Sequence, residues 1–385
     1  MSLIYLNEEH LMLQKMVREF AEAELKPIAQ EIDKNSTFPK SSIEKISKLG
    51  LMGIPWPVEY GGGGMDTISL VIAIEEMAKA CVSTAVTVMA HTSLGSGPFA
   101  LFGTTEQKKE YLTKLSKGEI IGAFGLTEPN AGSDAGNTQT TAVLEDDSYI
   151  VNGQKIFCTN AGVAGVIVFT AKIIEEGKEK GIGALYVDSD TKGLKVGKPE
   201  KKMGWRGSDT RSVYFDNMKI SSKNILGKPD KGFKQFLRTL TGGRISIAAL
   251  SLGICEAAYQ AALNYSTERE AFGKQINKFQ SVSFKLADMA TKIEAARHLV
   301  YSAAWMKDKK QNIIKEAAMA KLFSSELAMQ ITTDAIQLHG GYGYIREYNV
   351  ERFFRDAKIL AIGEGTSEIQ RIIISREILK SLKFA

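Results

Sequence analysis

The sequence is poor in the residues that build disulfide or metal frameworks. Its 385 residues include three cysteines and four histidines. Cys81, Cys158 and Cys255 lie far apart and form no C-x-x-C pair, which argues against a disulfide framework and a zinc site. No pair of histidines has metal-ligand spacing, so we expect no metal. This cysteine usage is typical of a reducing compartment, and we expect a cytoplasmic protein.

Several motifs of common function classes are also missing. Neither a G-x-x-x-x-G-K-[ST] loop nor a G-x-G-x-x-G after a strand occurs, which disfavours a P-loop or Rossmann nucleotide site. The formal charge of +5 is small and spread along the chain, so nucleic acid is not the expected ligand. No apolar run approaches the ~18 residues that span a bilayer. Residues 1–20 carry acids early in an amphipathic pattern, which is not typical of a secretory signal.

The first zone, residues 1–120, has a helical pattern and is expected to form an N-terminal helical domain. Ser41 and Glu44 have capping-box spacing, and Gly50 offers a helix stop. Thr104 and Gln107 repeat the same device. The four glycines that end at Gly64 predict a loop, because glycine is costly inside a helix.

The second zone, residues 121–230, consists of short β-type runs. Asn152-Gly153 stands between apolar residues and predicts a hairpin turn. Further strands are expected at residues 165–171, 184–188 and 212–216. Strands that follow one another without alternating helices favour an antiparallel sheet or barrel over a βαβ fold.

The third zone, residues 231–385, returns to helix. Ile293, Ala296, Val300 and Ala303 recur at helical spacing, and residues 317–339 continue as a helix until Gly340-Gly341 stops it. Consecutive long amphipathic helices predict a bundle. The fold class is therefore mainly α with a central β-domain.

Three segments carry the chemical information. Residues 125–134, GLTEPNAGSD, are dense in turn formers and hydroxyls that could bind a polar ligand, although an ordinary interdomain loop would look similar. Residues 337–356 combine a glycine turn with aromatics and charges, and a solvated helix connection is the alternative there. The third segment, residues 358–371, presents one acid between two glycines.

That acid is Glu364. The following residues 365–368 resemble a helix start, with Glu368 in the first turn where an acid suits the helix dipole. Glu364 would then lie beside backbone N–H groups that have no intrahelical partner. Such a carboxylate can act as a base while a neighbouring N–H polarises a carbonyl, but a simple capping acid remains the alternative.

Taken together, the three segments resemble those of the acyl-CoA dehydrogenase family, and most closely its short-chain, butyryl-type members. The likeness extends from end to end, since GIPWPVEYGG, REAFGKQI, FQSVSFKLADM and GEGTSEIQR also match family stretches in order and spacing. It implies an N-terminal helical domain, an antiparallel β-barrel-like domain and a C-terminal four-helix bundle. It also implies FAD as cofactor, an acyl-CoA substrate, electron-transferring flavoprotein as redox partner and a homotetramer.

The resemblance assigns roles to individual residues. In the family, FAD lies between the β-domain and the bundle and is reached partly by a neighbouring subunit. The implied cofactor-binding residues are Leu126, Thr127, Ser133, Phe157, Thr159, Arg269, Phe272, Gln280, Gln337, Gly341, Thr366 and Glu368. The implied substrate-side residues are Ser133, Thr241, Arg244 and Gly365.

Glu364 matches the family's catalytic base, which removes the α-proton of the thioester while the β-hydrogen leaves as hydride. Some branched-chain members place the base in an earlier helix, at the position of Gly243, which carries no acid here. Gly363 replaces a tyrosine that many short- and medium-chain relatives have, so a branched, cyclic or unsaturated acyl group stays open. His91 is expected to be a buried structural residue, with a place in the acyl pocket as the alternative.

The sequence leaves three other functions open. An enoyl-CoA reductase would use the same residues in the opposite direction. An acyl-CoA oxidase would pass electrons to oxygen, although its chains are usually much longer. A non-catalytic acyl-CoA-binding scaffold would need neither the base nor the flavin motifs.

Overall fold

The computed structural model describes residues 5–381, and the first four residues of the expected N-terminal pattern lie outside this range. The N-terminal zone is helical, as predicted. Its elements are α1 (Glu8–Phe20), η1 (Ala21–Leu25), α2 (Ala29–Asn35), α3 (Lys40–Lys48), η2 (Val58–Tyr60), α4 (Thr67–Ala80), α5 (Val82–Met89), η3 (Ala90–Ser96), α6 (Gly97–Phe102), α7 (Thr105–Gln107), η4 (Lys108–Leu112) and α8 (Thr113–Ser116). η3 is a π-helix, and it contacts β1 (Gly122–Gly125), the first strand of the sheet.

Of the two predicted capping boxes, one is confirmed and one is wrong. The Thr104 side chain accepts from the Gln107 N–H, and the Gln107 side chain accepts from the Thr104 N–H. At α3 the helix begins after Pro39, so Ser41 already lies in the first turn and makes no capping bond. Gly50 does follow the end of α3 in a left-handed conformation, with φ of 74°.

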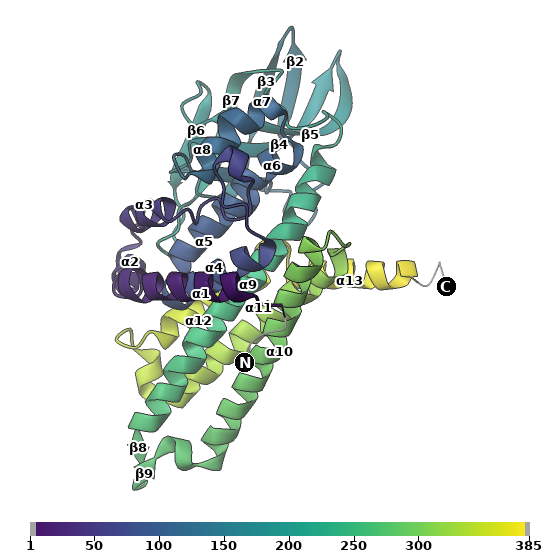
Figure 1. The fold of residues 1–385 in the computed structure, drawn as a ribbon. Coiled ribbons are helices and arrows are strands. Elements are labelled where there is room, and N and C mark those ends of the chain that lie inside the picture. The colour runs from purple at the N-terminus through teal and green to yellow at the C-terminus, as the bar shows by residue number, and fades with distance from the viewer. Residues whose placement is uncertain (1–4, 382–385) are drawn as a thin grey trace.

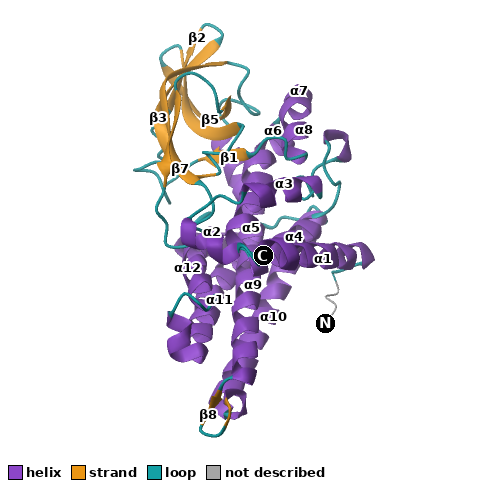
Figure 2. Ribbon diagram, turned by 90° about the vertical axis from the view of Figure 1, so that its left-hand side faces the viewer, coloured by secondary structure: helices purple, strands orange, loops and turns teal. Residues whose placement is uncertain are grey.

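The central zone forms a seven-stranded sheet, the upper layer in Figures 1 and 2. Its other strands are β2 (Thr141–Glu145), β3 (Ser148–Thr159), β4 (Val166–Glu175), β5 (Lys178–Asp188), β6 (Leu194–Pro199) and β7 (Thr210–Ser221). The order is β1-β4-β2-β3-β7-β6, with β5 also paired to β4. The pairs β2–β3, β3–β7, β4–β5 and β6–β7 are antiparallel as expected, whereas β4 runs parallel to both β1 and β2.

The hairpin predicted at Asn152-Gly153 is wrong. Both residues lie inside β3, where the pairing with β7 shifts between Val151 and Gly153. The hairpin turn that precedes β3 is at Asp146-Asp147 instead, because Glu145 pairs with Ser148. Gly153 therefore marks a bulge, for which its φ of 142° is suited.

The C-terminal zone is a helix bundle. It contains α9 (Gly232–Glu268), β8 (Glu270–Ala271), β9 (Lys274–Gln275), η5 (Ile276–Lys278), α10 (Gln280–Asp308), α11 (Ile314–His339), η6 (Gly340–Tyr344), α12 (Val350–Lys358), η7 (Ile359–Ala361) and α13 (Ser367–Ser381). α11 packs against α9, α10, α12 and α13. All four apolar residues predicted for the buried face of α10 are buried, and α11 ends at Gly340 as expected. The limits of the three domains themselves stay a prediction.

The hairpin β8–β9 lies at the opposite end of the molecule from the sheet (Figures 1 and 2). α9 connects these two ends, and within the described residues it is the one helix that is long and apolar enough to cross a membrane. Most of its apolar window is buried inside the protein, which is typical of a core helix. α9 therefore brings the sheet and the bundle into a shared interior.

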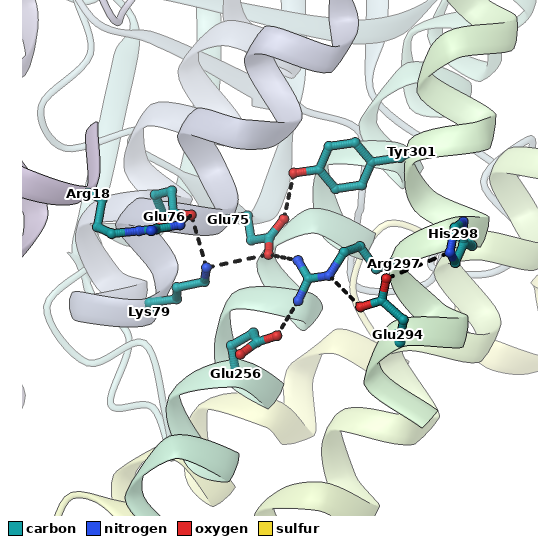
Figure 3. A network of polar contacts seen from close by, with 9 residues as sticks. All are labelled: Arg18, Glu75, Glu76, Lys79, Glu256, Glu294, Arg297, His298 and Tyr301. Carbon is teal, nitrogen blue, oxygen red and sulfur yellow. Dashed lines mark hydrogen bonds and ion pairs between the residues drawn. The ribbon is translucent and has the colours of Figure 1, made fainter. Parts of the chain in front are cut away.

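A network of ion pairs fixes the N-terminal helices to this bundle (Figure 3). Glu75 of α4 is fully buried, accepts from the Tyr301 hydroxyl at 2.8 Å and pairs with Arg297 of α10. Burial alone would raise the pKa of Glu75, but the charges of Arg297 and Lys79 outweigh it and keep the pKa below its usual value. Arg297 also pairs with Glu256 of α9, so one guanidinium joins three helices. The carboxylates here are satisfied, in contrast to the one described next.

Candidate active site

The turn between η7 and α13 holds Glu364 in an unusual backbone conformation. Glu364 has φ of 53° and Gly365 has φ of 92°, so two consecutive residues are left-handed. A side chain at residue 365 would be strained by this φ and would also meet the Gln370 amide nitrogen at 2.8 Å. Gly363 is under neither constraint, because a Cβ there would meet nothing closer than 3.5 Å. Of the two glycines that flank the acid, only Gly365 is required by the backbone.

The carboxylate of Glu364 lies against α9 at Gly243. A Cβ built on Gly243 would overlap Glu364 Oε2 and would lie 3.4 Å from Leu94 of η3. Glu364 Oε2 is enclosed, yet it has no hydrogen-bond partner among residues 5–381. Gly243, at the position where some branched-chain members carry the base, therefore has a second consequence besides the absence of an acid there. It creates the space that Glu364 occupies.

Two cations lie near this acid without a hydrogen bond to Oε2. Lys321 of α11 is fully buried and donates to the Gly365 carbonyl at 2.8 Å. Arg244 of α9 is buried, and its Nη1 reaches the Thr241 hydroxyl at 3.4 Å. Burial raises the pKa of Glu364 to about 7, against the opposing effect of the Lys321 and Arg244 charges. A carboxyl with such a pKa can take up and release a proton near neutral pH.

His91 is a structural residue, which confirms that expectation. It is fully buried in η3, where Nδ1 accepts from the Gly122 N–H at 3.0 Å and Nε2 lies 3.0 Å from the Leu115 carbonyl. Burial lowers its pKa to about 4, so the ring is neutral at physiological pH. Both ring nitrogens are occupied in joining η3 to β1 and to α8. His91 therefore has no nitrogen left for a ligand.

The segment that contains Leu126, Thr127 and Ser133 follows β1. The Thr127 carbonyl accepts from the Ile156 N–H at 2.8 Å, and Ser133 is exposed at the surface. Beneath them Glu128 accepts from Lys155 Nζ at 2.6 Å and from the N–H groups of residues 139 and 140. Lys155 also donates to the Leu126 carbonyl, at 3.3 Å. This ion pair joins the segment after β1 to β3 and fixes the backbone of the segment.

Phe157 and Thr159 lie at the end of β3, just beyond Lys155. The pairing with β7 shifts between residues 155 and 158, and Phe157 has φ of 56°. Its side chain is 62% exposed, which is unusual for an aromatic residue within a strand. Thr159 is half-buried. The bulge presents a bare aromatic ring, and a flat ligand could cover it.

Thr366 and Glu368 open α13, as predicted. The Thr366 hydroxyl accepts from the Ile369 N–H at 3.3 Å, and it therefore caps the helix. Glu368 is exposed in the first turn. On α9 the Thr241 hydroxyl donates to the Leu237 carbonyl at 2.9 Å and accepts from Arg244.

The other expected cofactor residues lie at the far tip of the same chain. Arg269, Gln337 and Gly341 line a cavity of about 430 Å³ beside Tyr265 and Tyr342. Phe272, between β8 and β9, is 96% exposed, and Gln280 begins α10 nearby. The expected flavin contacts of a single copy therefore lie in separate places, in the sheet, at the start of α13 and at the tip around Phe272. The resemblance implies this separation, because it assigns part of each flavin site to a neighbouring subunit.

The described residues fit FAD. The exposed Phe157 ring could stack on a flat ring system, and the open backbone at Gly341, where a Cβ would meet nothing within 4 Å, leaves room for the adenosine half. The site residues that sequence reasoning missed are Lys321 and Lys155. Lys321 follows the alanines at residues 317, 318 and 320, and this run is the signal that could have indicated it, whereas Lys155 has no comparable signal. No group of three or more possible metal ligands occurs among the described residues.

Comparisons with known proteins agree with this geometry. Three family models match the chain: acyl-CoA dehydrogenase N-terminal domain at residues 7–119, middle domain at 123–218 and C-terminal domain at 230–379. A probable acyl-CoA dehydrogenase of Bacillus subtilis is 52% identical and a short-chain specific acyl-CoA dehydrogenase of Clostridium acetobutylicum 49%, both covering 97% of this chain and 99% of the relative. A 3-(aryl)acrylate reductase of Clostridium sporogenes is 45% identical over 98% of this chain and all of the relative.

Solved structures give the same result. Butyryl-CoA dehydrogenase from Megasphaera elsdenii has a TM-score of 0.95 at 43% identity, over 98% of this chain and 100% of that chain. A chain of the structure described as "Electron transferring flavoprotein of Acidaminococcus fermentans: Towards a mechanism of flavin-based electron bifurcation" has a TM-score of 0.96 at 46% identity, with the same coverage.

Proposed function

The chain belongs to the acyl-CoA dehydrogenase family, and from this premise we propose that it oxidises a short- or medium-chain acyl-CoA to the trans-2-enoyl-CoA. It is an FAD-dependent oxidoreductase that acts on a CH–CH bond and passes electrons to electron-transferring flavoprotein. The observation that carries the proposal is Glu364, a half-buried residue in a left-handed turn whose enclosed Oε2 has no hydrogen-bond partner among the described residues. Such an acid is available for proton transfer.

In the proposed reaction Glu364 removes a proton from the α-carbon of the thioester. Bound FAD supplies the hydride acceptor for the β-hydrogen, so that the Cα–Cβ single bond becomes a double bond. Negative charge develops on the thioester oxygen as the proton leaves, and a fixed donor must stabilise it. The Glu364 N–H donates to no other residue within 5–381 and is free for this task. Arg244 is proposed to lie on the substrate side, and Gly365 to keep the backbone open to a flat thioester.

The turn at Gly363 bears on the size of the acyl chain. At Gly363 a side chain would meet only Ile359 at 3.5 Å or more, so the turn leaves free space where a larger residue would fit. The short-chain specific relatives support a short or medium acyl group, and this free space supports the inclusion of branched chains among the candidates.

A second candidate is the opposite reaction, reduction of an enoyl-CoA. One observation favours it: the reductase of Clostridium sporogenes is 45% identical over its whole length. In that direction Glu364 would deliver a proton to the α-carbon. Since burial sets its pKa at about 7, Glu364 is partly protonated at neutral pH and can serve in either direction.

We also propose a homotetramer in the cytoplasm. Support for an oligomer comes from the separation, within one chain, between the expected flavin contacts at the β8–β9 tip and those in the sheet. Two copies that place the tip around Phe272 beside the sheet of the neighbour would complete each site. The three cysteines are free and buried, which fits a reducing compartment.

Anaerobic titration of the purified holoprotein with acyl-CoAs, followed by flavin absorbance, tests the function. The panel contains straight C4 to C8, isobutyryl, 2-methylbutyryl, isovaleryl and cyclohexanecarbonyl thioesters. We expect one class to bleach the flavin of the wild type and to leave Glu364→Gln oxidised. Normal bleaching of Glu364→Gln would exclude Glu364 as the base. A protein that carries no flavin and takes none up would be a scaffold, and rapid reoxidation by oxygen would identify an oxidase.

A further inference from the structure

Lys321 is a fully buried lysine whose position the proposed reaction does not explain. It lies in α11 among the buried alanines Ala317, Ala318 and Ala320, and its ammonium donates to the Gly365 carbonyl at 2.8 Å. Burying an ammonium costs free energy unless hydrogen bonds and a nearby negative charge compensate for the lost water. The Gly365 carbonyl does not need this donor, because the Gln370 amide also donates to it at 2.8 Å. What Lys321 adds to the turn is a positive charge.

That charge acts on Glu364 without a bond to its Oε2 among the described residues. A direct ion pair would occupy the carboxylate and lower its ability to accept a proton. Here the ammonium is attached to the backbone one residue further on, while Glu364 Oε2 stays unpaired over Gly243. A salt bridge would both stabilise the negative charge of the carboxylate and occupy its oxygen with a hydrogen bond. Here the cation stabilises the charge, but Oε2 remains available to accept a proton.

We propose that Lys321 is a positioning residue for the reaction: its ammonium, held at the Gly365 carbonyl, favours the ionised form of the Glu364 carboxylate without bonding to it. The inference rests on the proposed role of Glu364 as the base. The charged groups that face this pair from the packed helices are Arg244 on α9, Glu326 on α11, and Glu368 and Arg376 on α13. Arg244 is the other cation that acts on Glu364, so the effect of Lys321 is measured with Arg244 intact.

The first test measures proton abstraction alone, by exchange of the α-protons of acetyl-CoA in D₂O on the holoenzyme. Acetyl-CoA has no β-hydrogen, so its exchange involves no hydride transfer. Because Glu364 must be ionised to act, the exchange rate falls at low pH. In Lys321→Met we expect the midpoint of this fall to move to higher pH by about one unit, since a neighbouring cation has been lost. Lys321→Arg restores the midpoint even where it lowers the rate.

The matched control is Lys315→Met, which changes a partly exposed lysine on the same helix and leaves the midpoint in place. A Lys321→Met profile that is lower at every pH but has an unmoved midpoint would overturn the proposal, because it would mean that the lysine only holds the turn. If Glu364→Gln exchanged as fast as the wild type, the proposed function itself would fail instead.

The second test needs no turnover. Thermal unfolding of Lys321→Met, Glu364→Gln and the double variant at pH 7.5 forms a double-mutant cycle. Removal of Lys321 should lower the melting temperature less when residue 364 is already uncharged. Equal decreases in the two backgrounds would contradict an electrostatic link between Lys321 and Glu364.

Discussion

Two glutamates of this protein, Glu128 in the segment after β1 and Glu364 in the turn before α13, have pKa values that shift in opposite directions. Burial alone would raise the pKa of Glu128, but Lys155 and the donors at residues 139 and 140 outweigh it, so the net pKa lies below its usual value. At Glu364 burial dominates, and the pKa rises to about 7. Each acid has a buried lysine nearby. Burial therefore does not decide which acid can act as a base.

The difference lies in what each lysine bonds to. Lys155 donates directly to Glu128 at 2.6 Å and also to the Thr170 hydroxyl, which makes a closed structural pair. Lys321 donates to a backbone carbonyl and leaves the carboxylate of Glu364 without that bond. The Lys155–Glu128 pair satisfies the hydrogen-bonding capacity of Glu128 and stabilises the fold. The arrangement of Lys321 leaves Glu364 Oε2 without a hydrogen bond from this lysine, as is common where a protein keeps a group available for chemistry.

The largest expected effect comes from breaking the satisfied pair. In Lys155→Met the carboxylate of Glu128 stays buried without its cation, and we expect the free energy of unfolding to fall by about 3–5 kcal/mol. Urea denaturation at one protein concentration measures this. The control is Lys195→Met, which breaks the exposed Lys195–Asp216 pair and should cost less than about 1 kcal/mol. If Lys155→Met also lowered the free energy of unfolding by less than about 1 kcal/mol, Glu128 would not have the structural role assigned to it.

The second effect concerns the space that Glu364 occupies. In Gly243→Ala the new methyl group would displace the Glu364 carboxylate, and a shift of this size can cost about 100-fold in rate. We expect this loss in single-turnover flavin reduction by a good acyl-CoA, with little change in urea stability because the side-chain end can move. Gly242→Ala is the matched control, since its methyl group would meet only the flexible end of Lys307 at 3.2 Å. If both variants reduced flavin equally fast, the position of Glu364 over Gly243 would not matter.

The smallest effect separates the two glycines of the turn. Gly363→Ala fits the available space, so we expect its unfolding free energy to stay within about 0.5 kcal/mol of the wild type. Gly365→Ala meets both a left-handed φ and the Gln370 amide, and should be destabilised by more than about 1 kcal/mol. Thermal unfolding distinguishes them. A larger loss at residue 363 than at residue 365 would contradict the backbone account of this turn.

Much of the fold could be predicted from local patterns, because helix periodicity and glycine stops act over a few residues. The buried face of α10 and the end of α11 at Gly340 were predicted in this way. Asn152-Gly153 was misread because a bulge and a hairpin turn use the same residues, and only the pairing of β3 with β7 separates them. The parallel contacts of β4 join strands distant in sequence, which no local pattern encodes.

At the site, the acid and its helix could be predicted, but its surroundings could not. Glu364 stands out because it precedes a helix start beside Gly365. That Lys321 would bond to the Gly365 carbonyl, and that Gly243 would make room for the carboxylate, depends on how α9 and α11 pack. A buried lysine and an exposed lysine look alike in a sequence, although the run of alanines around Lys321 was a usable sign.

The central claim, that Glu364 is free to act as the base while Glu128 is not, is tested most directly by acetyl-CoA α-proton exchange in D₂O on the FAD-bound enzyme. In the wild type we expect exchange to increase as the pH rises through about 7, because the pKa of Glu364 is raised by burial to that value. In Glu364→Gln exchange above pH 7 should fall by about 10²–10⁴-fold, and the increase through pH 7 should disappear. Exchange that persists unchanged in Glu364→Gln would show that another group removes the proton.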